Sequence, residues 1–360
     1  MTDQERTEAL QAQVAEAAGS GRALRVVGSG SKDFYGNPVE GQPLELASHR
    51  GVINYQPTEL VLTARAGTPL EEIQALLADN GQWLAFDPPR FDGPGTLGGA
   101  VAAGLSGPGR PYNGAVRDMV LGMRLINGRA EVMRFGGEVM KNVAGYDVSR
   151  LNTGALGTLG AILEVSVKVL PKPEATATLA LERPATDCRA CSEEWVRGGR
   201  PVTGVAHDGE QLRVRLAGTP SAVDDAVKGI GGEVMNPAEA DTFWSSLRDH
   251  QHPFFQKSDR PVWRLSLPPG ADPKPFGGDQ FVDWGGQQVW LTGDVDPTVL
   301  RQQAADAGGS ATLFRGQMAD LEAFPPLDAV KTRLHAALKD AFDPERIFNP
   351  GRLYPETKEH

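Results

Sequence analysis

The sequence predicts a protein of mixed α and β structure, of either the α+β or the α/β class, arranged in two domains. Three observations lead to this prediction. The length of 360 residues exceeds what one compact domain usually holds. Strand-like and helix-like segments alternate up to about residue 174. Beyond that point, short strand-like pieces are separated by turns rich in Pro and Gly, which places a domain boundary near residue 174.

The first domain is predicted to begin with a helix over residues 7–19 and a short apolar strand over 24–27. This strand leads directly into the small-residue loop Gly28-Ser29-Gly30-Ser31-Lys32. The main-chain amides of such a loop are free to point at an anion, although an ordinary strand-to-loop turn is the commoner outcome for this pattern.

The next strand, over residues 60–66, precedes a helix with clear boundary signals. Thr68 is the predicted N-cap, Pro69 occupies the first turn and Glu71 completes a capping box. Asn80-Gly81 supplies the stop. The sequence therefore predicts a helix between these signals.

The remaining elements follow from periodicity. Apolar residues alternate with polar ones over 163–169, as in a half-buried strand, and Pro171 ends it. The second region contains isolated strand-like pieces, which lie at residues 211–216, 262–267 and 288–292. The last helix is predicted over 327–342, with four aligned apolar positions: Leu327, Val330, Leu334 and Leu338.

Composition and charge exclude several classes of function. Hydrophobic residues make up 40% and charged residues 23% of the chain, as in an ordinary globular enzyme. The formal net charge of −10 argues against binding to a nucleic acid backbone. No apolar run approaches the roughly 20 residues of a membrane span, and the charged start lacks a signal-peptide core. Two cysteines, Cys188 and Cys191, fit a reducing compartment. We therefore expect a cytoplasmic protein without a transmembrane segment.

Glycine is concentrated between Gly93 and Gly160, where 16 of the 68 residues are glycine against 43 in the whole chain of 360. Glycine is needed where the backbone adopts positive φ or lies against a ligand without an intervening Cβ. This concentration therefore indicates a region where the main chain closely approaches a ligand.

The segment Gly93-Pro94-Gly95-Thr96-Leu97-Gly98 matches G-x-G-x-x-G, with Asp118 twenty residues after Gly98. A nicotinamide-binding unit requires a preceding central strand, and Pro88-Pro89 disfavours one. Two alternatives remain. The glycines let a helix over 97–103 pack closely, or the first amides of that helix face a phosphate.

A third glycine cluster is Gly154-Ala155-Leu156-Gly157-Thr158-Leu159-Gly160, directly before the alternating strand. Taken alone, this cluster is also typical of a tight turn packed on a sheet. The joint occurrence of three clusters in one domain is more informative, because two separated anion-binding loops suit a pyrophosphate and a third suits the passage of a nucleotide.

Three segments carry a specific resemblance: PGTLGGAVAAGLSG (94–107), YNGAVRDMVLGMRLING (112–128) and KNVAGYDVSRLNTGALGTLGAILEVSVKVLPKP (141–173). They resemble the FAD-binding domain of the vanillyl-alcohol oxidase and p-cresol methylhydroxylase (PCMH) superfamily, and within it most closely the E subunits of bacterial glycolate oxidases. The resemblance covers residues 20–173 and the closing FNPGRLY.

The resemblance implies an α+β fold: a two-subdomain PCMH-type FAD-binding domain over 1–174, a reduced α+β cap over 175–325, and a C-terminal helix and tail over 326–360 returning to the FAD domain. It assigns the pyrophosphate loop to Gly28, Ser29, Gly30 and Ser31, and a second phosphate-contacting turn to Thr96, Gly98 and Gly99. It places Gly104 and Ser106 beside the flavin, and Gly160 and Ile162 where the main chain passes the adenine.

Two departures from the superfamily pattern shape the expected chemistry. The first loop carries Ser31 and Lys32 where members with covalent flavin often have histidine, so FAD is expected to bind non-covalently. The histidine-rich substrate motif of 2-hydroxy acid flavoenzymes is missing.

His250 and His252 in DHQHPFF could bind a metal, but a structural role is favoured. The Cys188–Cys191 pair is also expected to be structural. The catalytic residues stay unknown, and Lys141, Asn142 and Tyr146 form a polar stretch that either faces the flavin or supports its loop.

The resemblance therefore implies the FAD-binding subunit of a glycolate oxidase complex that oxidises glycolate to glyoxylate. Its expected partners are a catalytic FAD subunit, an iron–sulfur subunit that receives the electrons, and a small 2-hydroxy acid as substrate. The expected location is the cytoplasm, with peripheral contact to the inner membrane through the complex as a further expectation. The alternatives are an autonomous FAD-dependent dehydrogenase of 2-hydroxy acids such as D-lactate or glycolate, and a non-catalytic assembly subunit.

Overall fold

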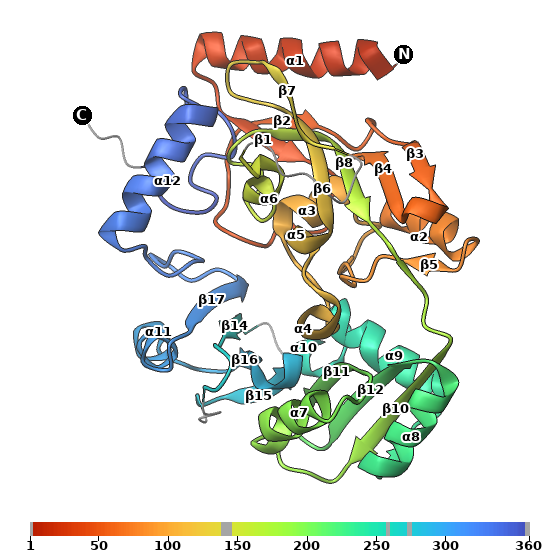
Figure 1. Cartoon of the computed structure of the whole chain (residues 1–360). Helices are drawn as coiled ribbons and strands as arrows, with labels where there is room; N and C mark the ends of the chain where they lie inside the picture. Colours follow the sequence, from red (N-terminus) through yellow and green to blue (C-terminus); the bar gives the residue numbers. More distant parts are fainter. Residues whose placement is uncertain (1–2, 138–145, 257–259, 272–275, 357–360) are drawn as a thin grey trace. The chain divides into compact units, whose positions relative to one another are not determined.

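The computed structural model describes residues 3–137, 146–256, 260–271 and 276–356 (Figure 1). Its contacts divide the chain into two compact units, and each is described by itself. The first comprises residues Met1–Leu105, Ala115–Pro171 and Pro326–His360, and the second comprises Ser106–Gly114 and Lys172–Pro325. The short segment that ends at Gly114 thus belongs to the second unit, although it lies well before residue 174.

The first unit contains a five-stranded sheet, the two-stranded sheets β1–β2 and β5–β9, and several helices (Figure 1). Its elements are α1 (Asp3–Ser20), β1 (Leu24–Val27), β2 (Gln42–Glu45), β3 (Val52–Gln56), η1 (Pro57–Glu59), β4 (Val61–Arg65), α2 (Leu70–Ala78), β5 (Gln82–Trp83), α3 (Leu97–Ala103), α5 (Val116–Met119), β6 (Val120–Ile126), β7 (Val132–Gly136), α6 (Val148–Asn152), β8 (Ala161–Lys168), β9 (Leu170–Pro171) and α12 (Ala329–Phe342).

The larger sheet of this unit is antiparallel and has the strand order β3-β4-β8-β6-β7. Its central strand β8 is the one that alternation predicted. The buried Val165 of β8 pairs with Ala64 of β4 on one side and Met123 of β6 on the other. These side chains form one core with buried residues of α2 and α3, including Ile73 and Val101. The core therefore fixes where α3 begins relative to the sheet.

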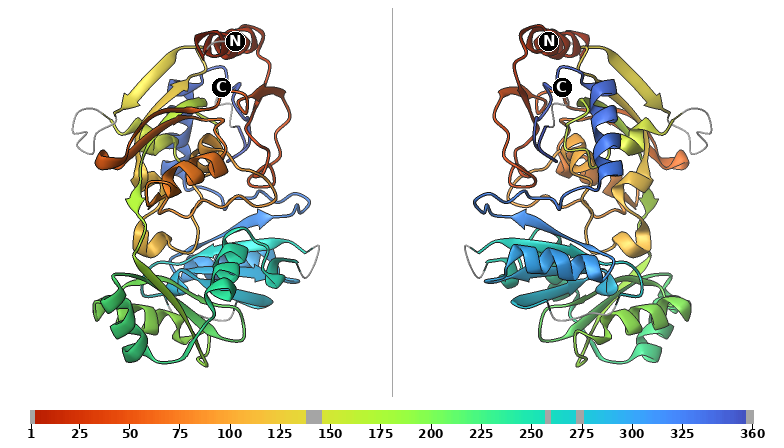
Figure 2. Two further views of the ribbon diagram at one scale, coloured as in Figure 1. Left: turned by 90° about the vertical axis from the view of Figure 1, so that its right-hand side faces the viewer. Right: turned by 90° about the vertical axis from the view of Figure 1, so that its left-hand side faces the viewer.

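A parallel pair, β1 and β2, forms the second sheet of the unit. The C-terminal tail extends it, because Phe348 forms a parallel bridge with Leu24 of β1. Figure 2 shows this tail, coloured blue, passing close to the red N-terminal segments. Val14 of α1, Leu24 and Phe348 are fully buried in a shared core. Residues more than 300 positions apart in sequence thus share one layer.

The helix α2 forms where the sequence predicted it, but the predicted cap is wrong. The helix starts at Leu70, and its N-cap Pro69 has no side-chain cap. The hydroxyl of Thr68 instead accepts a hydrogen bond from the amide of Gly51 at 2.9 Å. Thr68 thereby joins two loops, a tertiary contact that a local pattern cannot reveal.

The last helix, α12, also forms as predicted, but its apolar stripe is not the part that is buried. Val330 and Leu334 are 56% and 55% exposed. Lys339 is the residue of α12 that is buried, and it is only 6% exposed. The helix is therefore held to its unit by a buried charge, as described below.

The second unit contains helices and one long antiparallel sheet. Its elements are α4 (Arg110–Asn113), β10 (Ala175–Leu181), α7 (Asp187–Arg197), β11 (Val202–His207), β12 (Leu212–Gly218), α8 (Pro220–Ile230), β13 (Glu233–Val234), α9 (Pro237–Arg248), α10 (Pro253–Gln256), β14 (Val262–Ser266), β15 (Asp279–Asp283), η2 (Trp284–Gly286), β16 (Gln288–Thr292), α11 (Pro297–Asp306) and β17 (Ser310–Arg315).

This sheet has the strand order β13-β10-β12-β11-β15-β16-β14-β17, and it is built from two halves of the same topology. The first half runs β10-α7-β11-β12-α8-β13, a split βαβ unit of the ferredoxin-like kind. The second half repeats its strand order through β14, β15, β16, α11 and β17. Between β14 and β15, the described residues contain no helix that corresponds to α7. Sequence inspection finds no internal repeat, so this repeat is one of topology.

The two faces of this sheet carry different side chains, because successive residues of a strand point to opposite faces. Leu179 of β10 belongs to the core formed with α7, α8 and α11. Its neighbour Thr178 accepts a hydrogen bond from Trp244 of α9 at 3.0 Å. The second face is covered by an aromatic cluster whose members include Phe243, Trp244, Phe281, Trp290 and Phe314.

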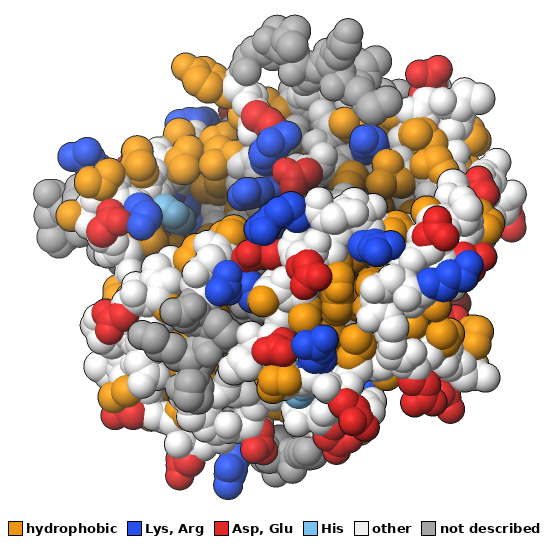
Figure 3. Space-filling view, turned by 60° about the horizontal axis from the view of Figure 1, so that its bottom comes forward, with side chains coloured by type: hydrophobic (Ala, Val, Ile, Leu, Met, Phe, Trp, Pro, Cys, Tyr) orange, Lys and Arg blue, Asp and Glu red, His pale blue; other side chains and the backbone are white. Residues whose placement is uncertain are grey.

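The class prediction is confirmed. The sheets are antiparallel apart from the β1–β2 pair, so the protein belongs to the α+β class and not to the α/β class. Acidic and basic side chains are interspersed on the face drawn in Figure 3, where the coloured residues form no continuous basic stripe. Among the described residues, no helix is long and apolar enough to cross a membrane.

Candidate cofactor site

The loop after β1 presents a row of main-chain amides. Within the described part of the chain, the amides of Gly28, Ser29, Gly30 and Ser31 donate no hydrogen bond. Gly30 has φ of +75°, and the hydroxyl groups of Ser29 and Ser31 lie 3.3 Å apart. Consecutive amides without an acceptor form a concave site for an anion. The loop is therefore suited to hold an anion.

Two adjoining cavities lie against this loop, with volumes of about 580 and 440 Å³. The lining of the larger is Arg25, Val26, Gly28, Ser29, Gly30, Ser31, Lys32, Asp33, Thr96, Gly99, Ala102, Ala103, Leu156, Asn349 and Arg352. The lining of the smaller is Val26, Gly28, Leu46, Ala66, Thr96, Gly98, Gly99, Ala102, Leu156, Gly157, Gly160, Ile162 and Asn349.

Most of the predicted cofactor residues meet at these cavities, although they come from three separate segments. The first is the loop 28–31, the second is the turn 96–99, and the third runs from 156 to 162. Those in the linings are Gly28, Ser29, Gly30, Ser31, Thr96, Gly98, Gly99, Gly160 and Ile162. Gly104 and Ser106 line neither cavity. Gly104 ends α3 with φ of +65°, and Ser106 belongs to the second unit.

The glycines keep the first two segments close together. A Cβ atom at Gly28 would lie 2.9 Å from Oγ1 of Thr96, and one at Gly99 would lie 3.0 Å from the same atom. A Cβ atom at Gly98 would lie 2.5 Å from that of Ala66. Larger residues at Gly28 or Gly99 would displace Thr96, and one at Gly98 would clash with Ala66.

The start of α3 differs from the expectation that its first amides face a phosphate. The amide of Leu97 donates to the carbonyl of Thr68 at 3.0 Å, and that of Gly98 donates to Ala66 at 2.8 Å. The amide of Gly99 donates to the Thr96 hydroxyl at 3.1 Å. These donors are used within the protein. The turn therefore shapes the cavity, and the amides without acceptors belong to the first loop.

The third segment contains three residues with positive φ angles. Leu156 has φ of +51° and Gly157 has φ of +69°. At Gly160 φ is +150°, and a Cβ atom there would lie 2.5 Å from the carbonyl oxygen of Ile126. Only glycine fits at this approach of the loop to β6. The next buried residue in the cavity wall is Ile162 of β8.

The C-terminal tail completes the site, and site prediction from the sequence missed its contribution. Asn349 accepts a hydrogen bond from the amide of Val26 at 2.9 Å. Its side-chain amide donates to the carbonyl of Leu156 at 2.6 Å. The FNPGRLY resemblance was the available signal, but it did not identify Asn349 or Arg352 as lining residues.

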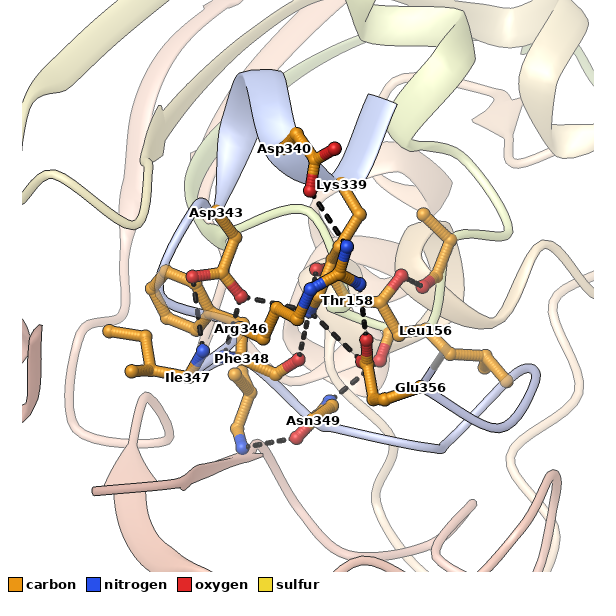
Figure 4. A network of polar contacts seen from close by, with 12 residues as sticks. Leu156, Thr158, Lys339, Asp340, Asp343, Arg346, Ile347, Phe348, Asn349 and Glu356 are labelled. Atoms are coloured by element: carbon orange, nitrogen blue, oxygen red, sulfur yellow. Dashed lines mark hydrogen bonds and ion pairs between the residues drawn. The ribbon is translucent and has the colours of Figure 1, made fainter. Parts of the chain in front are cut away.

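A buried network anchors this tail to the third segment (Figure 4). The ammonium group of Lys339 donates to the carbonyls of Thr158 and Phe348 and to the carboxylate of Asp343, each at 2.8 Å. Asp343 also accepts hydrogen bonds from the amides of Ile347 and Phe348. One buried ion pair therefore holds both the tail and the loop that precedes β8.

Neither Tyr146 nor the two cysteines line this site. Tyr146 is 95% exposed, and Lys141 and Asn142 lie outside the described residues. Cys188 and Cys191 are buried on α7, and burial raises the pKa of both thiols. Such thiols are poor nucleophiles and metal ligands.

The histidines of the second unit are built into its structure. The ring of His250 stacks on Phe255 with 3.8 Å between centroids, and burial holds its pKa well below the usual value. His207 contacts the carbonyl of Arg183 at 3.0 Å, and His252 accepts from the amide of Phe254 at 3.2 Å. The described residues contain no group of three or more His, Cys, Asp or Glu placed to hold a metal ion.

The second unit has a cavity of its own, of about 740 Å³. Its lining is Arg110, Ser266, Leu267, Pro268, Trp284, Gln287, Gly308, Gly309 and Ser310. The guanidinium group of Arg110 lies 4.6 Å from the ring centre of Trp284, whose indole N–H donates to the carbonyl of Gly107 at 3.1 Å. A cation held on an aromatic ring in a cavity wall is suited to contact an anionic ligand.

Comparisons with known proteins agree with this geometry. Residues 4–136 match the model of the FAD binding domain family. The chain is 44% identical over 350 residues to the glycolate oxidase subunit GlcE of Escherichia coli, which covers 97% of this chain and 98% of that protein. It is 32% identical over 143 residues to the glycolate oxidase subunit GlcD of Bacillus subtilis, covering 39% and 30%.

Solved structures share the fold. The structure of p-cresol methylhydroxylase with substrate bound aligns with a TM-score of 0.69 at 18% identity, covering 96% of this chain and 87% of that one. A 4-ethylphenol oxidase from Gulosibacter chungangensis aligns with a TM-score of 0.71 at 16% identity, covering 97% and 88%. At these identities the likeness shows the fold, which confirms the predicted PCMH-type architecture.

Proposed function

The chain belongs to the family of the glycolate oxidase subunit GlcE, and we propose that it serves as the FAD-binding subunit of a complex that oxidises glycolate to glyoxylate. FAD is its cofactor. When bound, FAD supplies the two-electron acceptor that this oxidation requires. The tasks of the chain itself are to hold FAD and to exclude water around it.

The observation that carries this proposal is the meeting of the Gly28–Ser31 loop, the Thr96 turn and the Gly160 segment at two adjoining cavities. The four loop amides without acceptors suit the pyrophosphate, and the hydroxyls of Ser29 and Ser31 add donors beside them. The smaller cavity, with the mostly apolar wall that includes Ile162, suits the adenosine part. The Ser31-Lys32 loop contains no histidine, so we propose non-covalent binding.

Substrate oxidation also needs a base for the hydroxyl proton and a cation for the carboxylate. The described histidines of the second unit are engaged in packing or in main-chain contacts, so we assign no base to this chain. A partner subunit of the GlcD type is proposed to complete the catalytic site.

We further propose that electrons leave the complex through an iron–sulfur subunit. The cysteines of this chain are a single buried pair, and the described residues supply no cluster of ligands. The proposed location of the complex is the cytoplasm, with peripheral contact to the inner membrane.

An autonomous 2-hydroxy acid dehydrogenase is the main alternative, and a non-catalytic assembly subunit is the other. Anaerobic visible spectra of the FAD-loaded chain separate the three. We expect the flavin bands to persist when glycolate or D-lactate is added and to bleach once the partner subunits are present. Bleaching of the isolated chain would indicate an autonomous dehydrogenase. A folded chain that binds no flavin would indicate an assembly protein.

A further inference from the structure

The larger cavity has an electrostatic character opposite to that of the whole chain. Its lining contains the cations Arg25, Lys32 and Arg352, and Asp33 is the one carboxylate in that lining. The lining therefore carries two net positive charges in a chain whose formal net charge is −10. An excess of cations around main-chain amides that have no acceptor favours the binding of an anion.

Arg352 is the cation whose position depends most on the fold. It belongs to the C-terminal tail, more than 300 residues after the loop that it contacts. Its guanidinium group donates to the carbonyls of Lys32 and Asp33 at 3.2 and 3.0 Å. The carbonyl of Arg352 accepts from the amide of Asn37 at 3.0 Å. The tail is therefore held across the end of the loop.

The charges around Arg352 are only partly balanced. Burial and the nearby charge of Arg25 lower its pKa, whereas Asp33 raises it. The carboxylate of Asp33 is already shared, since it pairs with Arg25 at 3.2 Å. Arg25 and Arg352 carry like charges and share one counter-ion, so they repel each other. An anion in the cavity would relieve this repulsion.

We propose that Arg25, Lys32 and Arg352 form a cationic clamp that neutralises the pyrophosphate of FAD, with the C-terminal tail supplying one arm. The net charge of the lining, three cations and the carboxylate of Asp33, matches a pyrophosphate diester, which carries one negative charge on each phosphate. This inference rests on FAD being the cofactor. It predicts that FAD binding and the position of the tail depend on each other.

Titration of the flavin-free full-length chain with FAD, followed by flavin fluorescence at low and high salt, tests the clamp. We expect Arg352→Gln and Arg25→Gln to weaken FAD binding by roughly ten- to a hundredfold, the usual loss for a charged hydrogen-bonding partner. Their affinity should also depend less on salt than that of the wild type. Arg352→Lys keeps the charge and should retain most of the salt dependence.

Arg22→Gln is the matched control. Arg22 lies three residues before Arg25, pairs with the exposed Glu16 and lines neither cavity, so its variant should bind FAD as the wild type does. Trypsin gives a second readout, because FAD should slow cleavage after Arg352 in the wild type. In Arg25→Gln this protection should require correspondingly more FAD.

Several results would overturn the clamp. Wild-type affinity and salt dependence in Arg352→Gln would show that the charge is not used. Equal loss in Arg352→Lys and Arg352→Gln would show that Arg352 only holds the loop, and equal loss in Arg22→Gln would remove the specificity of the effect. Failure of the wild-type chain to bind FAD would contradict the cofactor assignment itself, whereas the other results contradict the clamp alone.

Discussion

Asn349 donates a hydrogen bond from its side-chain amide to the carbonyl oxygen of Leu156 at 2.6 Å, and through this contact the end of the chain reaches the cofactor site. The same side chain accepts from the amide of Val26 at 2.9 Å. It thus connects the strand that leads into the first loop with the segment that leads into β8. Asn349 also has φ of +40°, a conformation that asparagine tolerates.

Replacing Asn349 by Ala should therefore loosen the site from two sides. We expect the free energy of unfolding to fall by about 1–3 kcal/mol, because the amide of Val26 and the carbonyl of Leu156 lose their partner. FAD affinity should fall with it. Asn80→Ala is the control, since Asn80 caps the exposed end of α2. Chemical denaturation and FAD titration of both variants measure the effects. Equal FAD affinity in wild type and Asn349→Ala would contradict the role of the tail.

The close approach of Gly99 to Thr96 predicts the effect of a branched side chain. Gly99→Val should abolish FAD retention in a folded protein, because its Cβ would lie 3.0 Å from the Thr96 hydroxyl and the methyl groups would enter the cavity. At Gly19, by contrast, a Cβ would meet nothing within 4 Å, so Gly19→Val serves as the control. The flavin-to-protein absorbance ratio after purification gives the result. A normal ratio in folded Gly99→Val would refute the assignment of this turn.

The buried ion pair of Lys339 and Asp343 predicts a large effect on stability. Lys339→Met should lower the free energy of unfolding by about 3–5 kcal/mol, because it leaves the carboxylate of Asp343 buried without its cation. Lys331→Met on the same helix removes an exposed pair with Asp328 and should leave stability unchanged within error. Thermal and urea unfolding of the two variants compare them. Similar stability in both would show that the buried pair is not what anchors α12.

His250 predicts how the stability of the second unit depends on pH. Burial, with the nearby charges of Arg315 and Arg264, lowers its pKa in the folded state well below 6.5. Below about pH 6.5 the unfolded chain takes up a proton that the folded chain does not, so stability falls as pH falls. Urea unfolding at pH 7.5 and pH 5 should show a smaller pH effect in His250→Asn than in the wild type. An identical pH effect would assign the loss to other groups.

The cysteines provide a test of the packing of α7. Cys188 is 1% exposed and Cys191 is 9% exposed, and burial raises the pKa of both thiols. Both should react with a disulfide reagent at pH 8 only after the protein is unfolded. Rapid labelling of the native chain, monitored by absorbance, would contradict this packing.

Sequence reasoning succeeded where the signal is local. The loop Gly28–Ser31 follows its strand directly, and its small residues indicate the free amides that the structure shows. The alternation at β8 likewise reflects the two faces of one strand. The predicted cap at Thr68 failed because its hydroxyl bonds Gly51, a partner that folding brings close from another loop.

The parts that could not be predicted depend on long-range contacts. Asn349 and Arg352 reach the site because the tail pairs with β1, and no local pattern encodes that pairing. The apolar alignment of Val330 and Leu334 suggested a packed helix face, yet a buried Lys339 anchors the helix instead. The repeated topology of the second unit is also invisible in the sequence, because the two halves share strand order and not residues.

The visible absorption spectrum of the purified full-length chain, recorded after incubation with FAD and removal of the free cofactor, shows whether this chain holds FAD. We expect flavin bands that stay with the folded protein and are released on denaturation, because the cofactor is not covalently bound. A folded chain without flavin bands, across a range of FAD concentrations, would contradict this expectation.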